Sequence, residues 1–225
     1  SDYYPERDGC GIHASGRNDK PDILPSHEGF LRFRLSNNKK YLFHRFDHCM
    51  TEDALLIVAK LMELSARTAP KALGQDYLEV KILARNEKDS VGSEMIKIGE
   101  TNHSAGFSRD GKNVLDSEAI VLIGLLKHPG LGTDCKACGY ESCKEFNKAS
   151  VEGKFRGPNC VHRVADLGIA VGSAVKTAAI HNVDNRVMYR AGNAERSLGI
   201  MKSNIVYGIP ISATGKNIFF DRKQI

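Results

Sequence analysis

The sequence predicts an α+β protein in which helices flank a mixed or antiparallel sheet. Apolar residues recur at helical spacing after Thr51, whereas residues 77–83 alternate between apolar and polar side chains as in a strand with one covered face. The run at 119–125 has no polar face, which predicts a central strand covered on both sides. Residues 164–180 are almost wholly small and apolar, and they predict a helix buried on most of its sides.

The remaining elements of this core are shorter. Thr51 is a suitable N-cap for the first helix, which we expect to end near Arg67. A weaker helix is expected over 87–99. A last helix over 192–201 leads to a strand at 204–209, and we expect a polar loop after it.

The N-terminal part of the chain has a different composition. Residues 1–49 are interpreted as an N-terminal extension, because their first part is polar and punctuated by proline and glycine. Within the extension, residues 30–35 and 39–46 are predicted to pair as a hairpin. Residues 50–225 are predicted to form the main domain.

Length, charge and hydropathy exclude several classes of protein. The chain has 225 residues and a formal net charge of +5, too small an excess to indicate a nucleic-acid partner. No apolar run is long enough for a membrane span. Residues 1–5 lack the pattern of a secretory signal, so we expect a cytoplasmic protein whose cysteines stay reduced.

Four of the six cysteines fall in one short segment, with the spacing C-x2-C-x4-C-x16-C. They are Cys135, Cys138, Cys143 and Cys160. Gly139 can adopt the positive φ that a loop around a cluster often needs, and Cys143 is expected near the start of a helix over 141–151. Four thiolates with nearby backbone donors are what a 4Fe-4S cluster requires. The segment 130–163 is therefore predicted to be a cluster-binding module inserted in the main domain.

Other interpretations of these cysteines remain open. A zinc ion held by four cysteines is one alternative, although such sites usually show two short cysteine pairs. Disulfides are disfavoured in a reducing compartment. Cys10 and Cys49, which lie outside the segment, are interpreted as ordinary free thiols, and His162 as a surface residue beside Cys160.

The cysteine segment resembles the small 4Fe-4S domain of corrinoid iron–sulfur proteins and of electron-transport subunits from anaerobes. A wider resemblance extends over about 50–225. It is carried by the segments 66–72, 109–111, 166–174, 184–186, 208–216 and 219–222. Together these segments are similar to the ferredoxin-domain-containing proteins of anaerobic bacteria and archaea.

The order of the elements also resembles that of flavin-dependent nitroreductases. Both open with a helix that ends in Ala-x-x-Ala-Pro, here Ala66–Pro70, and that leads into a strand. Both continue with a buried strand, a long helix of small residues and a last strand ending in Gly-x-Pro. The arginine run that precedes the first helix in nitroreductases is reduced here to Arg45.

This resemblance implies a possible second cofactor, FMN. Its phosphate would be held by basic residues at the ends of elements: Arg67, Lys71, Arg186, Lys216 and Arg222. The implied function is electron transfer through the cluster, to or from a flavin or another partner, protein or small molecule. The alternatives are a binding or redox-sensing protein with a structural cluster, and a zinc-stabilised interaction module. The apolar helix at 164–180 further predicts a homodimer.

Overall fold

The computed structural model describes residues 38–220, with side chains from residue 53 onward. The chain divides into two compact units, Ser1–Thr51 and Glu52–Ile225. The described part of the first unit is helical and forms the beginning of helix α1 (Asn38–Thr68). The predicted strand at 39–46 is therefore wrong, and its predicted partner at 30–35 lies outside the described residues. Extending an existing helix avoids the cost of nucleation, which favours helix over a new hairpin here.

The second unit is built on a four-stranded antiparallel sheet with the order β1-β2-β4-β3. The strands are β1 (Leu78–Ala84), β2 (Ala119–Leu125), β3 (Asp184–Asn185) and β4 (Ile205–Ser212). The predicted strands at 77–83 and 119–125 are confirmed, while β4 continues past its predicted end and β3 was not predicted. Leu125 pairs with Leu78 and Ile205 at one end of the sheet, the module end. Ala119 pairs with Ala84 and Ile211 at the other, the β3 end.

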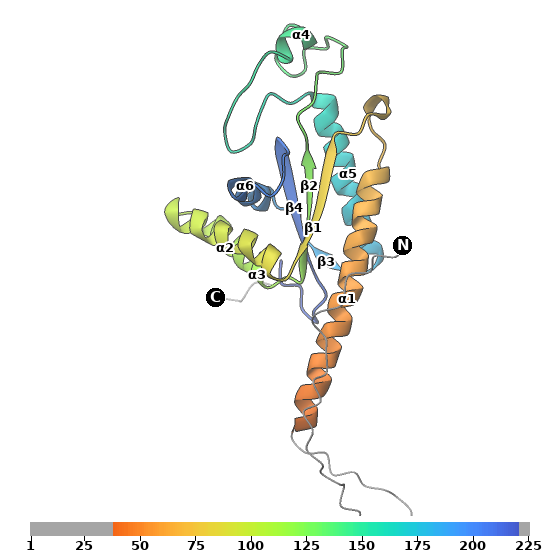
Figure 1. The fold of residues 1–225 in the computed structure, drawn as a ribbon, viewed down its shortest axis with the longest axis vertical. Helices are drawn as coiled ribbons and strands as arrows, with labels where there is room; N and C mark the ends of the chain where they lie inside the picture. The colour runs from red at the N-terminus through yellow and green to blue at the C-terminus, as the bar shows by residue number, and fades with distance from the viewer. Residues whose placement is uncertain (1–37, 221–225) are drawn as a thin grey trace, which may run out of the picture. The chain divides into compact units, whose positions relative to one another are not determined.

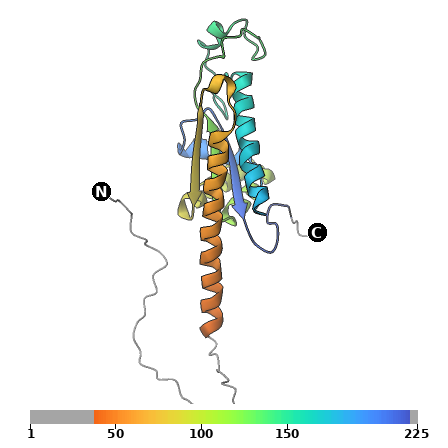
Figure 2. The same ribbon diagram turned by 90° about the vertical axis from the view of Figure 1, so that its right-hand side faces the viewer.

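Helices cover both faces of this sheet, as Figures 1 and 2 show. Helices α1 and α5 (Val161–Ile180) pack on one face, and α2 (Asn86–Thr101), α3 (Ala105–Leu115) and α6 (Tyr189–Leu198) on the other. Every residue of β2 is buried, as its lack of a polar face predicted. Val121 and Ile123 point into the first core, and Ile120 and Leu122 into the second. The second unit thus forms an α+β fold of three layers.

The second core depends on close approach of backbones. A Cβ built on Gly192 of α6 would lie 1.8 Å from the carbonyl oxygen of Val206, so only glycine fits there. Helix α6 begins and ends three residues earlier than predicted, because Gly199 adopts φ 68° and terminates it. Helix α3, which was not predicted, is tied to α6 by buried Asp110, whose carboxylate accepts hydrogen bonds from Arg109 and Arg190.

Helix α5 confirms the predicted helix but not its predicted burial. Only one face of it is buried, through residues such as Leu167, Ala170 and Ala174. The opposite face keeps Val164 (39% exposed) and Ile169 (44% exposed) at the surface. Within the described residues, the sheet and α1 cover one side of α5 and leave the other side exposed. No helix within residues 38–220 combines the length and the hydropathy needed to cross a membrane.

Candidate metal centre

The cysteine module lies between β2 and α5, beyond the module end of the sheet (Figure 1). Cys135 and Cys138 occupy a loop, and Cys143 is the first residue of the short helix α4 (Cys143–Phe146). Cys160 is the N-cap of α5. All four cysteines are free thiols, and their exposure falls from Cys135, which is exposed, to Cys160, which is buried.

The loop around the first two cysteines is built from left-handed residues. Gly139 has φ 85°, as predicted, and its N–H donates to the carbonyl oxygen of Lys136 at 2.9 Å. Asp134 and Lys136 also have positive φ. Such turns direct backbone N–H groups inward, where they can meet anionic sulfur.

Helix α4 begins where the sequence predicted a helix but ends after one turn. The Ser142 hydroxyl caps it by accepting a hydrogen bond from the N–H of Glu145. The predicted continuation to residue 151 is wrong, because the chain leaves the helix at Asn147. The Asn147 side chain instead accepts a hydrogen bond from the N–H of Gly130 and ties α4 to the start of the module.

Hydrogen bonds bring the segments that carry the cysteines close together. The Cys143 N–H donates to the carboxylate of Asp134, next to Cys135, at 2.6 Å. The Cys135 sulfur lies 3.9 Å from Nε2 of His162, two residues after Cys160. Within the described residues, however, no group of three or more His, Cys, Asp or Glu side chains is arranged to hold a metal ion. The four cysteine sulfurs are the ligand type that an iron–sulfur cluster requires. The hydrogen bonds bring the segments that carry the cysteines close together, but the sulfur atoms themselves do not converge on one metal position.

Cys135 has an environment that favours its thiolate. The backbone N–H of Ala137 lowers the pKa of the Cys135 thiol, and a hydrogen bond with the side chain of Thr133 lowers it further. Metal ligation requires the deprotonated sulfur. The two donors therefore prepare Cys135 to act as a ligand.

His128 links the end of β2 to Cys160. Its Nδ1 lies 2.8 Å from the Leu126 carbonyl oxygen, and its Nε2 accepts a hydrogen bond from the Cys160 N–H at 3.0 Å. These partners assign the proton to Nδ1 in a neutral ring. Burial lowers the pKa of His128, which agrees with that neutral form. His128 is thus a fixed support for the backbone of Cys160.

Arg163 anchors the start of α5 to the segment before β1. Its guanidinium is 1% exposed and lies 3.3 Å from the Asp166 carboxylate. It also donates to the Ala72 carbonyl oxygen at 2.9 Å and to the side chain of Gln75. Asp166 in turn accepts the Ala72 N–H at 2.9 Å. This paired charge holds the helix that begins after Cys160 in a fixed place.

Aromatic rings continue this anchorage into the module. The guanidinium of Arg163 lies 4.8 Å from the centre of the Tyr77 ring. The rings of Tyr77 and His128 are 6.1 Å apart, and those of His128 and Phe146 are 6.2 Å apart. Tyr140 then meets the Phe146 ring edge-on at 5.9 Å. The module is therefore packed against the sheet rather than suspended from two loops.

The basic residues predicted to hold a phosphate do not converge within one chain. Arg67 donates to the Leu78 carbonyl oxygen at 2.9 Å and Lys71 to the Arg67 carbonyl oxygen at 2.6 Å, so both lie at the module end. Arg186 follows β3, and Lys216 follows β4, at the opposite end of the sheet. Arg222 lies outside the described residues. The predicted convergence of Arg67 and Lys71 with Arg186 and Lys216 on one phosphate is wrong, because the sheet separates the two groups.

Comparison with family models finds two matches. Residues 156–222 match a family described as "Uncharacterized protein containing a ferredoxin domain", and residues 132–162 match a model described as a candidate Fe-S cluster. An uncharacterized protein from Archaeoglobus fulgidus is 44% identical over 171 residues, which cover 76% of this chain and 92% of that protein. The chain belongs to this ferredoxin-domain family.

Solved structures show which fold this ferredoxin-domain protein shares. Nitroreductase CinD from Lactococcus lactis, in complex with chloramphenicol, aligns with a TM-score of 0.50 and 11% identity, over 75% of this chain and 82% of that chain. A nitroreductase-like family protein from Bacillus cereus aligns with a TM-score of 0.47 and 8% identity, over 75% and 78% of the two chains. The fold is nitroreductase-like, with the Fe-S-type segment inserted between β2 and α5.

Three polar residues of this site and its surroundings were not singled out from the sequence. His128 and Arg163 find their partners far along the chain, and Glu195 is a 1%-exposed carboxyl group on α6. A signal existed for Arg163, because a basic and an acidic residue three positions apart interrupt an otherwise apolar helix. No comparable sequence signal marks His128 or Glu195.

Glu195 supports the loop between α6 and β4. Its Oε1 accepts the N–H of Met201 at 2.5 Å, while nearby Glu79 accepts the N–H of Lys202 at 2.9 Å. Burial raises the pKa of Glu195 to about 7, and the negative charge of Glu79 adds to this effect. The buried carboxyl group is thus held largely protonated below neutral pH.

We expect the free energy of unfolding to depend on the titration of Glu195. A folded-state pKa above the ordinary 4.5 contributes stability at low pH that is lost as the pH rises through about 7. The loss is roughly 3 kcal/mol, at about 1.4 kcal/mol per pKa unit. Glu195→Gln, which mimics the protonated form, should flatten urea-unfolding stability between these pH values. Exposed Glu100→Gln is the control, and a slope retained in the Glu195 variant would contradict the assignment.

Proposed function

We propose that this chain is an iron–sulfur redox protein. It binds one 4Fe-4S cluster through Cys135, Cys138, Cys143 and Cys160 and exchanges electrons with a second donor or acceptor. The observation that carries the proposal is the set of four free thiols in one module, in a segment that matches a candidate Fe-S cluster. Zinc accounts less well for the spacing, which has one short cysteine pair and two single cysteines.

The residues around the module serve such a centre in distinct ways. A bound cluster supplies one-electron chemistry. Ala137 and Thr133 stabilise the thiolate of Cys135, and His128 fixes the backbone of Cys160. Cys135 is exposed, so this side of the module is open to a partner from solution. Buried Cys160 faces the protein, where Arg163 holds the start of α5.

An electron-transfer role is favoured over a purely structural cluster by this asymmetry. A cluster that served only to hold the fold would gain nothing from an exposed ligand. The redox-sensing alternative shares the exposed ligand, and it differs in having no turnover with electron carriers. Anaerobic reduction of the protein followed by mixing with a one-electron acceptor distinguishes the two roles. An electron-transfer protein is reoxidised rapidly and in repeated cycles, whereas a redox sensor is not.

Iron analysis gives the most direct test of the cluster. Anaerobically purified protein should be brown and contain about four iron atoms per chain, as a four-thiolate cubane requires. Cys138→Ser should lose most of the iron and the visible absorption, while Cys49→Ser, outside the module, should keep both. Stoichiometric zinc without iron in the parent protein would overturn the proposal.

A finer proposal concerns a flavin. The resemblance of the sequence to flavin-dependent nitroreductases, together with the fold shared with a nitroreductase, makes FMN the first candidate for a second cofactor. Of the two sets of basic residues, the set at the β3 end, Arg186 and Lys216, is the better phosphate site. Lys71 already binds carbonyl oxygens at the end of α1, whereas Lys216 is exposed in the polar loop after β4. Arg186 holds that loop by donating to the Phe219 carbonyl oxygen at 3.3 Å.

We expect the fluorescence of FMN to be quenched saturably when FMN binds to the anaerobic holoprotein. Lys216→Gln should weaken FMN affinity about tenfold, because it removes one charge-assisted contact to the phosphate. Lys71→Gln is the matched control and should have little effect. Equal weakening by both variants, or no saturable quenching, would count against a phosphate site at the β3 end.

A homodimer is also proposed. Its support is the uncovered face of α5, where apolar side chains alternate with Gly168 and Gly172, at neither of which a Cβ would meet anything within 4 Å. Large apolar faces of this kind are usually covered in obligate dimers. Light scattering at micromolar concentration should give twice the chain mass, and Ile169→Glu should reduce it to the monomer. Lys112→Gln on α3, which also lowers the net charge by one, is the charge-matched control, and a monomeric parent protein would refute the dimer.

A further inference from the structure

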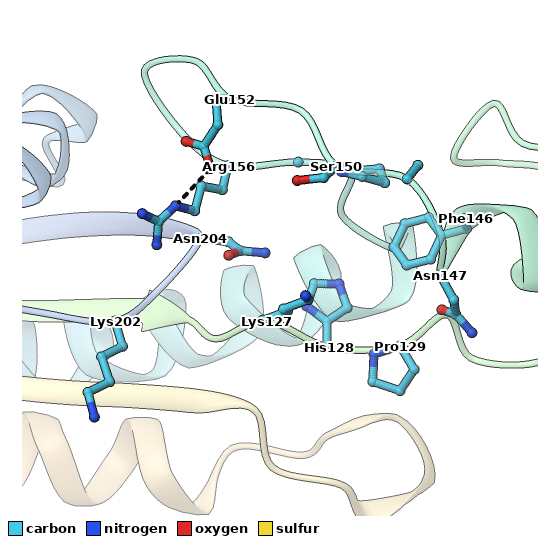
Figure 3. Close-up of a pocket in the computed structure, with 13 residues that line it drawn as sticks. Lys127, His128, Pro129, Phe146, Asn147, Ser150, Glu152, Arg156, Lys202 and Asn204 are labelled. Carbon is cyan, nitrogen blue, oxygen red and sulfur yellow. Dashed lines mark hydrogen bonds and ion pairs between the residues drawn. The ribbon is translucent and has the colours of Figure 1, made fainter.

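A cavity of about 710 Å³ opens between the cysteine module and the module end of the sheet. In Figure 3, residues of the module from Phe146 to Arg156 face residues that follow β2, including Lys127 and His128, and Asn204 before β4. The two walls are joined by backbone contacts, since the Arg156 N–H donates to the Asn204 carbonyl oxygen at 2.9 Å. This volume lies within the range of small-molecule sites in proteins.

The charge on the walls of this cavity is predominantly positive. Lys127, Lys202 and Arg156 line it, and Glu152 is the acidic residue among the lining residues. The Glu152 carboxylate is already shared, because Arg156 lies 3.1 Å from one oxygen and Arg196 2.5 Å from the other. Both lysines are exposed, and within the described residues neither ammonium group has an ion pair. The cavity therefore has an excess of cationic groups over the anions that could neutralise them.

The inner surface of the cavity is suited to an apolar or aromatic body. Phe146 and His128 are both buried and lie with their rings 33° from parallel. Pro129 and Pro158 add apolar surface. Because both nitrogens of His128 are engaged by backbone groups, its contribution to the wall is the ring itself. The buried amide of Asn204 supplies a polar contact between this surface and the cationic rim.

We propose that this cavity binds a small organic anion, a carboxylate or phosphate attached to an apolar or aromatic body. Lys127 and Lys202 attract the anionic group at the rim, and the Phe146–His128 surface holds the body. The site is separate from the proposed phosphate site at the β3 end. It also adjoins Cys160, whose N–H is bound by His128, so an occupant would contact the module directly.

Calorimetric titration of anaerobic holoprotein at low ionic strength tests this site. The probes are phenyl phosphate, benzoate and uncharged benzamide. We expect saturable binding of at least one anion and at least about tenfold weaker binding of benzamide, since charge-assisted contacts discriminate between them. The anion that binds more tightly identifies the group as phosphate or carboxylate.

The double variant Lys127→Gln, Lys202→Gln locates the binding. It should weaken the preferred anion at least about tenfold, whereas Lys112→Gln, an exposed lysine on α3, should leave the affinity unchanged. Circular dichroism checks that each variant is folded. Absence of binding by both anions, equal affinity for benzamide, or an unchanged affinity in the double variant overturns the proposal. Any of these results in protein with full iron content would leave the proposed cluster intact, so the two failures are distinguishable.

Discussion

The buried guanidinium of Arg163 is the interaction on which the position of the cysteine module depends. A charge removed from water is tolerated only when it is paired and hydrogen-bonded, and Arg163 satisfies this with Asp166, the Ala72 carbonyl oxygen and the side chain of Gln75. Because Ala72 and Gln75 precede β1 and Arg163 follows Cys160, these hydrogen bonds join two parts of the chain that are far apart in sequence. The rings of Tyr77, His128 and Phe146 extend the same contact into the module.

The sheet sets the distance between the functional regions proposed for this protein. Its seven-residue strand β2 spans roughly 20 Å, at about 3.4 Å per residue. The cysteines and the cationic cavity lie at one end, and Arg186 with Lys216 lies at the other. A phosphate at the β3 end therefore does not touch the module of the same chain. The cavity, in contrast, is lined in part by residues of the module, so a small molecule bound there would contact the module.

The strongly patterned parts of the chain could be predicted from sequence, because their patterns are local. An uninterrupted apolar run predicts a buried strand or helix, and β2 is such a strand. Closely spaced cysteines likewise predict a single metal-binding site. Helix α3 was missed because its sequence contains two glycines, Gly106 and Gly111, which disfavour a helix in isolation. A Cβ on Gly111 would lie 2.8 Å from the Gly92 carbonyl oxygen, so this glycine is required by packing against α2. The separation of the basic residues and the partners of His128 follow from strand order, which no local pattern specifies.

The hydrogen bond between His128 and Cys160 closes the module at its base. The chain leaves the sheet after Leu125, and it returns beside the same strand end, where His128 receives the Cys160 N–H at 3.0 Å. Since the strand pairings of the sheet do not pass through this excursion, the nitroreductase-like framework and the cysteine segment are structurally separable. A framework of this kind could gain, lose or exchange such a segment by a single insertion or deletion. Transfer of the module to a related framework would therefore require two neighbouring attachment points and also the partners that fix it against the sheet, among them Tyr77 and His128.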